Sequence, residues 1–193
     1  MFRMKRSIHH RHVAILTLTF LMLAACTGWA FTVPIIYETG STAAPTLPCP
    51  VALSLSQEFA SYQHSVHGWN YHADFGPALQ KYASFVARSV FGDAQVLDSQ
   101  SSRPEARLLL VPRVTSSDLA EHGGVALGIQ WDFKDPKTGQ TLFTMHVQCE
   151  TVSPGMNPLA ALRRAAGGNM TNLTSLTIQR FNASRGLQQL SGH

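Results

Sequence analysis

Three cysteines, Cys26, Cys49 and Cys149, offer the most varied chemistry in this 193-residue chain. A thiol can be modified covalently, can pair with a second thiol in an oxidising compartment, or can stay buried as a small apolar group. Cys26 directly follows Leu23, Ala24 and Ala25. Because small residues let a backbone enter a peptidase groove, this position suits cleavage just before the thiol.

An apolar run from Val13 to Leu23 leads to Cys26. The residues ahead of it carry positive charge and no acidic side chain, at Arg3, Lys5, Arg6 and Arg11. Charged, apolar and small-residue zones in this order are typical of an export signal. The run is shorter than the roughly 20 residues that a membrane-spanning helix needs, so a retained span is the weaker alternative.

The sequence Leu23-Ala24-Ala25-Cys26, at the end of this run, resembles the lipobox of bacterial lipoprotein precursors. The resemblance implies that residues 1–25 are a lipoprotein signal peptide. It also implies that Cys26 becomes a diacylglycerol cysteine, whose acyl chains, palmitate among them, hold the mature chain on a membrane. Thr27 stands where an Asp would resemble an inner-membrane retention signal. We therefore expect a protein that is lipid-anchored to the outer membrane and faces the periplasm.

The net charge of +4 belongs to the signal-like segment. Four of the 15 Lys and Arg residues lie there, so residues 26–193 hold 11 basic and 11 acidic side chains. No basic stripe with interleaved aromatic residues follows, which argues against nucleic-acid binding. A mature chain of this length suffices for one domain with its own core.

Residues 26–48 are rich in Thr, Ser, Ala and Pro, a composition that predicts a flexible tether behind the acylated N-terminus. One apolar patch, residues 33–37, could instead add an edge strand to the domain. We place the periplasmic domain at residues 49–193.

Cys49 and Cys149 each extend an apolar alternation, so both side chains are expected to face one core. An oxidising periplasm permits them to form a disulfide. The alternative is two separate buried thiols.

Local patterns predict the order of the elements in the domain. Gly76-Pro77 opens an amphipathic helix that Gly92 ends, since proline suits a first helical position and glycine a left-handed stop. Strands are expected at residues 51–55, 94–97 and 107–111, a hairpin at 125–133 and 141–149, and one or two helices after Asn157. Pro112 must end its strand or lie at a sheet edge. This order predicts an α+β two-layer sandwich, in which a mostly antiparallel sheet of four to five strands carries two or three helices on one face.

This order of elements is shared with a known group of proteins. Together with Phe75-Gly76-Pro77-Ala78-Leu79 and residues 133–140, it resembles small periplasmic lipoproteins of envelope assembly and transport. The group includes transport-auxiliary lipoproteins and TolB-N-terminal-like domains, and the resemblance covers residues 49–190. It implies that the domain acts as a partner or scaffold for a larger envelope machine.

The long segment 56–75 collects residues with binding chemistry. Trp69, Tyr71 and Phe75 could be interface anchors for a partner, or could cap the core beside the first helix. His64, His67 and His72 could offer imidazoles to a metal, but their spacing matches no metal motif. We expect no metal site.

Catalytic patterns are weak in this sequence. No Gly-x-Ser-x-Gly motif occurs. Asp74, Asp118, Asp132 and Glu150 could in principle pair as acid and base for glycan cleavage. We expect no enzyme and no cofactor. The leading hypothesis is a non-enzymatic lipoprotein whose periplasmic domain binds an envelope protein as an accessory in assembly or transport. A carrier or sensor of a lipid or other apolar ligand is the alternative, and an envelope hydrolase is third.

Overall fold

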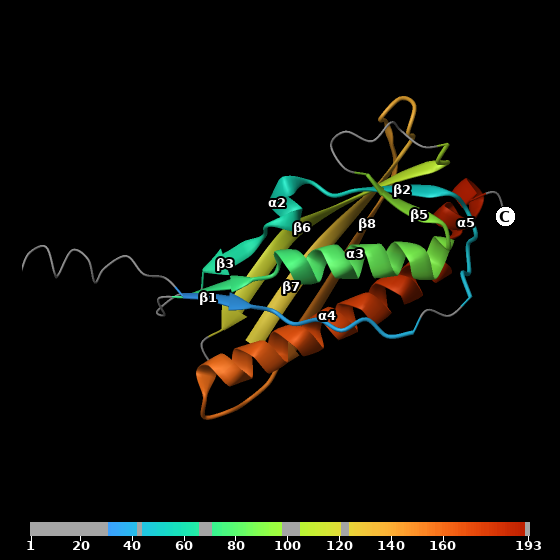
Figure 1. The fold of residues 1–193 in the computed structure, drawn as a ribbon. Helices are drawn as coiled ribbons and strands as arrows, with labels where there is room; N and C mark the ends of the chain where they lie inside the picture. Colours follow the sequence, from blue (N-terminus) through green and yellow to red (C-terminus); the bar gives the residue numbers. More distant parts are fainter. Residues whose placement is uncertain (1–30, 42–43, 66–70, 98–104, 121–123, 192–193) are drawn as a thin grey trace, which may run out of the picture. The chain divides into compact units, whose positions relative to one another are not determined.

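The computed structural model describes residues 31–41, 44–65, 71–97, 105–120 and 124–191 (Figure 1). The chain divides into two compact units, residues 1–31 and 32–193, and the second unit holds the folded domain. Within the described ranges, no helix has both the length and the apolar character to cross a membrane.

A five-stranded sheet forms one layer of the domain. Its order is β5 (Ala94–Leu97), β2 (Val51–Ser54), β6 (Leu108–Ala120), β7 (Gly124–Lys134) and β8 (Thr141–Val152). The long strands β6, β7 and β8 pair antiparallel. The short strand β2 runs parallel to both of its neighbours. The sheet is therefore mixed, because β2 reaches each neighbour through a long crossover.

A smaller sheet has the order β1 (Phe31–Pro34), β4 (Tyr71–Asp74) and β3 (Gln63–Ser65). The short helix α2 (Gln57–Ala60) precedes β3, and Ser56 caps it by accepting a hydrogen bond from the Phe59 amide. Much of the segment that looked irregular in the sequence is therefore a short helix and a three-residue antiparallel pairing.

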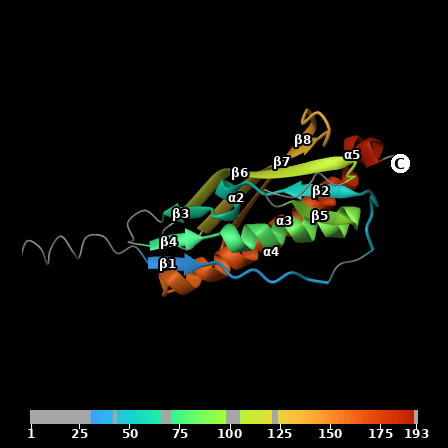
Figure 2. The same cartoon turned by 45° about the horizontal axis from the view of Figure 1, so that its top comes forward.

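The helices α3 (Gly76–Phe91) and α4 (Pro158–Ala183) lie side by side on one face of the large sheet, as Figures 1 and 2 show, and α5 (Arg185–Ser191) follows. Gly92 ends α3 with a φ of +80°, as expected of a glycine stop. Asn157 caps α4, because its side chain accepts from the Ala160 amide at 3.1 Å.

Two glycines lie inside α4, where glycine usually weakens a helix, yet the helix continues through them. A Cβ added at Gly167 would lie 3.3 Å from the Ile36 carbonyl oxygen, and one at Gly168 would lie 3.4 Å from the Thr151 methyl group. The helix therefore packs closely on the N-terminal segment on one side and on β8 on the other. This packing offsets the lower helix stability that glycine causes.

Aromatic rings fill the space between the sheet and the helices. Phe181 of α4 lies 5.3 Å from Trp131 and 5.2 Å from Phe133, both on β7, between ring centroids. The Tyr82 hydroxyl of α3 accepts from the Trp131 indole at 3.2 Å and lies 2.7 Å from the Thr177 hydroxyl. Thr177 donates its own proton to the Leu173 carbonyl, so Tyr82 donates to Thr177. One buried hydrogen-bonded chain therefore joins β7, α3 and α4.

The predicted fold class, an α+β sandwich with helices on one face, is confirmed. The strand after residue 107 continues through Pro112 as β6, which pairs with β2 only at residues 108–110. Pro112 lies beyond that pairing, on the free side of β6. Of the two expected outcomes for this proline, the second therefore occurs: β6 continues through Pro112, which lies where one side of the strand is unpaired.

The tether prediction is wrong over part of its length. Burial alternates along residues 32–37, as it does along a strand. The buried residues are Val33, Ile35 and Tyr37, and the exposed ones are Thr32, Pro34 and Ile36. Leu47 is also buried, and its amide donates to the Val90 carbonyl at 2.8 Å. The domain thus starts at residue 32 rather than 49, because these apolar side chains have core surface to cover.

The disulfide prediction is also contradicted, since Cys49 and Cys149 are both free. Cys49 lies just before β2, and Cys149 lies in β8, so β6 and β7 separate them. Three steps across a sheet span roughly 14 Å, whereas the Cα atoms of a disulfide lie within about 7 Å. The alternation put both side chains toward the core but could not show how far apart the two strands lie.

We expect two free thiols in the domain under non-reducing conditions. A Cys26→Ser variant should react with a thiol reagent at two sites after unfolding, and a reductant should leave its melting temperature unchanged. Cys49 should react slowly in the folded protein, because burial raises the pKa of its thiol against the lowering effect of Arg107. Recovery of no free thiol after unfolding would contradict this arrangement.

Candidate functional site

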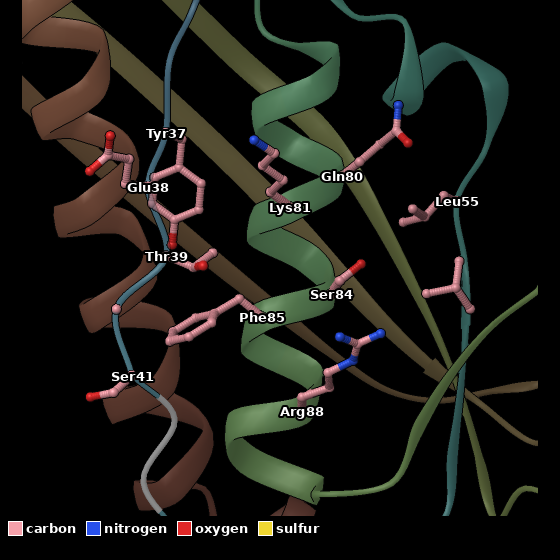
Figure 3. Close-up of a pocket in the computed structure, with 12 residues that line it drawn as sticks. Tyr37, Glu38, Thr39, Ser41, Leu55, Gln80, Lys81, Ser84, Phe85 and Arg88 are labelled. Atoms are coloured by element: carbon pink, nitrogen blue, oxygen red, sulfur yellow. The ribbon is translucent and has the colours of Figure 1, made fainter.

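An open groove of about 980 Å³ runs along the outer surface of α3 (Figure 3). One wall is the extended segment 37–41, and the outward face of α3 forms the floor. Leu55, just after β2, lies on the other side of α3 (Figure 3), and Val96 of β5 also lines the groove. The α3 side chains in the groove are Gln80, Lys81, Ser84, Phe85 and Arg88. These positions are three to four residues apart around one helical face, opposite the buried stripe of the same helix.

Tyr37 holds the extended wall in place. Its side chain is buried, and its hydroxyl lies 2.7 Å from the Thr174 hydroxyl of α4. Thr174 donates to the Met170 carbonyl, so the tyrosine is the donor to Thr174. Burial raises the pKa of Tyr37. The wall therefore depends on a neutral tyrosine that reaches across to the neighbouring helix.

The groove has the chemistry of a binding surface for an extended chain. Lys81 and Arg88 are exposed and lie two turns apart on α3, with Glu38 on the opposite wall. Among the described residues, neither cation forms an ion pair. Phe85 is half-buried and offers an aromatic surface between them. The arrangement can bind acidic and apolar side chains in alternation, and its lining holds no paired acid and base.

The structure separates the three aromatic residues that we considered as interface anchors. Trp69 lies outside the described residues. Tyr71 is half-buried in β4, where burial raises the pKa of its hydroxyl. Phe75 is completely buried at the start of α3. Phe75 is thus part of the core, which is the alternative that the sequence left open, because the turn into α3 points its side chain inward.

Cys26, the expected acylation site, also lies outside the described residues. Of the three histidines, His67 does too. His64 pairs with Ala73 and His72 pairs with Ser65 in the antiparallel β3–β4 ladder. Adjacent positions on a strand point to opposite faces, so His64 and His72 do not converge. Within the described ranges, no three His, Cys, Asp or Glu side chains gather as metal ligands do.

Asp132 lies on the face of the large sheet away from α3 and α4. Its carboxylate accepts from Gln130 at 2.7 Å and from Thr144 at 3.0 Å, and it forms an ion pair with Arg113 at 3.5 Å. Asp118 and Glu150 flank Ala126 on the two neighbouring strands, which puts roughly 10 Å between their backbones. Asp74 accepts from the Gly76 amide at the start of α3. The four acidic residues are thus spread over two sheets. The partners of Asp132 are side chains of the same sheet, so its carboxylate stabilises the pairing of neighbouring strands.

Sequence reasoning did not single out the residues of the groove. Lys81 and Arg88 lie on the polar face of the expected helix, but a charged face usually meets only solvent. The residues of the opposite wall come from a segment that was expected to be a tether, so no pattern joined the two.

Neither the family models nor the curated proteins contain a match to this chain. Solved structures do match it. A Xanthomonas campestris protein of the DUF330 family superposes with a TM-score of 0.51 at 12% identity, over 83% of this chain and 96% of that one. This likeness shows a shared fold, a two-layer α+β domain.

Two looser structural neighbours have lipoprotein names. A candidate lipoprotein from Caulobacter crescentus gives a TM-score of 0.39 at 12% identity, over 73% of this chain and 87% of that one. Lipoprotein B from Nitrosomonas europaea gives 0.32 at 10% identity, over 80% of this chain and 91% of that one.

Replacing Tyr37 by Phe should lower the free energy of unfolding by about 1 kcal/mol at neutral pH, because Thr174 loses its hydrogen-bond donor. The raised pKa favours the neutral tyrosine in the folded state. Its stabilising effect is therefore present below the ordinary pKa of 10.0 and is lost as pH rises above it. Urea unfolding between pH 7 and 11 should show a shallower alkaline loss in Tyr37→Phe than in the parent.

Ser84→Ala is the matched control, since this side chain lies in the groove without a buried partner. It should change stability by less than about 0.5 kcal/mol. An unchanged pH profile in Tyr37→Phe would show that Tyr37 does not anchor the wall.

Proposed function

We propose that this chain is a lipoprotein acylated on Cys26, whose periplasmic domain is a non-enzymatic accessory that binds an envelope protein. The groove on α3 carries the proposal, because it is an open, partly charged channel of about 980 Å³ between two walls. Extended chain segments bind in such channels through side chains that alternate between pockets and solvent. The lipobox-like sequence and the export signal support the membrane address.

The structure offers less support for a carrier of apolar ligands. Such a ligand needs an apolar cavity between the sheet and the helices. That space holds Trp131, Tyr82 and Phe181, which are all fully buried, and the Trp131 ring contacts both of the others. The groove on α3 has polar and charged side chains along most of its length. Partner binding therefore remains the leading function.

Thr27 after the acylated cysteine supports delivery to the outer membrane with the domain in the periplasm. An envelope location also fits a role in assembly or transport. The occupant of the groove that we favour is an extended segment with acidic side chains, since Lys81 and Arg88 outnumber Glu38 there.

The anchor is tested by metabolic labelling in cells that express the full chain. Labelled palmitate should mark the parent protein and should not mark Cys26→Ser. Cys149→Ser is the control variant and should keep the label, because its thiol is part of the folded domain. A labelled Cys26→Ser protein, or an unlabelled parent, would contradict acylation at this residue.

The groove is tested by site-specific photocrosslinking in the same cells. A photoreactive residue at position 84, on the α3 surface, should give one discrete adduct with a partner protein. The same residue at Thr138, in the exposed turn between β7 and β8, should not.

The double substitution Lys81→Glu with Arg88→Glu should abolish the adduct at position 84, because it reverses the charge of the floor. Both side chains are exposed, so stability should change by less than about 0.5 kcal/mol per site. Equal adducts at positions 84 and 138, or an adduct that survives the double substitution, would exclude the groove as the binding site.

A further inference from the structure

The N-terminal segment of the domain runs alongside α4 and in the same direction. Three pairs of neighbours mark its course. Ile36 lies against Gly167, Tyr37 reaches Thr174, and Thr46 is hydrogen-bonded to Asn182 near the end of the helix. The N-terminal end of this segment therefore lies toward the N-terminal end of α4.

The distances match along this stretch. From Ile36 back to Thr32, an extended chain covers roughly 13 Å. From Gly167 back to Pro158, a helix covers roughly 13.5 Å. Thr32, the first residue of the folded unit, is thus level with the first turn of α4, and Figures 1 and 2 show β1 beside that end of the helix.

The end of the domain at the start of α4 exposes apolar side chains. Met156, in the turn between β8 and α4, is completely exposed, Val152 at the end of β8 is 62% exposed, and Leu159 in the first turn of α4 is 37% exposed. The turn has a defined shape, because Arg164 of α4 donates to the Ser153 hydroxyl at 3.3 Å.

The same end carries charged side chains of both signs, since exposed Asp118 and Glu150 lie near the ends of β6 and β8. Arg163 and Arg164 are both exposed in the second turn of α4. No Asp or Glu occurs after Glu150, so α4 itself has no acidic side chain beside these two arginines. Apolar side chains beside arginines form the pattern with which proteins lie on an anionic bilayer surface, since the guanidinium groups stay at the headgroups.

We infer that the β8–α4 turn and the first two turns of α4 are a second membrane contact, with a bilayer of anionic lipid as the partner. This inference rests on the proposed acylation of Cys26. Six residues lead from Cys26 to Thr32, which limits the separation of the lipid anchor and the domain to roughly 20 Å. The end of the domain that carries Met156 and Arg163 is therefore the one that the anchor holds near the headgroups. The contact orients the domain so that its opposite end, the turn between β7 and β8, points away from the membrane.

Fluorescence quenching in vesicles tests this orientation with the acylated full-length protein. The protein is reconstituted into vesicles of phosphatidylethanolamine and phosphatidylglycerol that contain a nitroxide lipid. An environment-sensitive dye is attached to Met156→Cys or, as the matched control, to Thr138→Cys, each in a Cys149→Ser background. We expect a blue-shifted emission and strong quenching by the nitroxide lipid at position 156, with neither effect at position 138.

Charge is tested by two further substitutions in the position-156 protein. Arg163→Glu should reduce the quenching, and so should replacement of phosphatidylglycerol by phosphatidylcholine. Arg185→Glu, at the start of α5 and beyond the far end of α4, should leave it unchanged.

Palmitate labelling of the same preparations separates the two proposals. If Cys26 carries the label and position 156 is not quenched, or is quenched no more than position 138, the second membrane contact is wrong and the lipid anchor stands. Protection of position 156 from an aqueous quencher without quenching by the nitroxide lipid would assign this end to a protein partner and would equally overturn the inference. If Cys26 carries no label, the proposed anchor itself fails.

Discussion

The buried chain of hydrogen bonds from Trp131 through Tyr82 to Thr177 joins the three elements on which the rest of the domain depends. It connects β7 to α3 and α3 to α4 in a space filled mainly by apolar side chains. Polar groups in such a space are costly unless each finds its partner, so the three elements fit together in one register. Burial raises the pKa of Tyr82 far above its ordinary value, which is consistent with a hydroxyl that stays neutral as part of this chain.

The position of α3 decides where the outer groove lies. Because the stripe containing Leu79 and Tyr82 is buried in the core, the face with Lys81 and Arg88 must point outward. The second wall follows from α4 in the same way, since Tyr37 reaches Thr174 of that helix. The groove is thus formed by two elements that both pack on the aromatic core, so a substitution in the core should also change the shape of the groove.

The two ends of the domain differ in chemistry for a topological reason. The N-terminal segment lies parallel to α4, so the start of the folded unit, the β8–α4 turn and the first arginines of α4 meet at one end. The tight turn between β7 and β8 lies at the other end of the hairpin, where Asp135 accepts from the amides of Lys137 and Thr138. The lipid anchor that we propose at Cys26 would give this asymmetry a direction relative to a membrane.

The sequence by itself determined the elements whose signals are local. Pro77 and Gly92 bracket α3, Asn157 caps α4, and strict alternation marks β7, because capping and periodicity act within a few residues. The acylation motif is local in the same sense. Only the tertiary structure decided the rest. The burial of Phe75, the separation of Cys49 from Cys149, and the packing of residues 33–37 on α4 each depend on which strands and helices become neighbours, and that information is distributed over the whole chain. The sequence could not predict the groove for the same reason. Its wall, residues 37–41, and its floor on α3 lie some 40 residues apart in the sequence, and they become neighbours only because Tyr37 packs on α4.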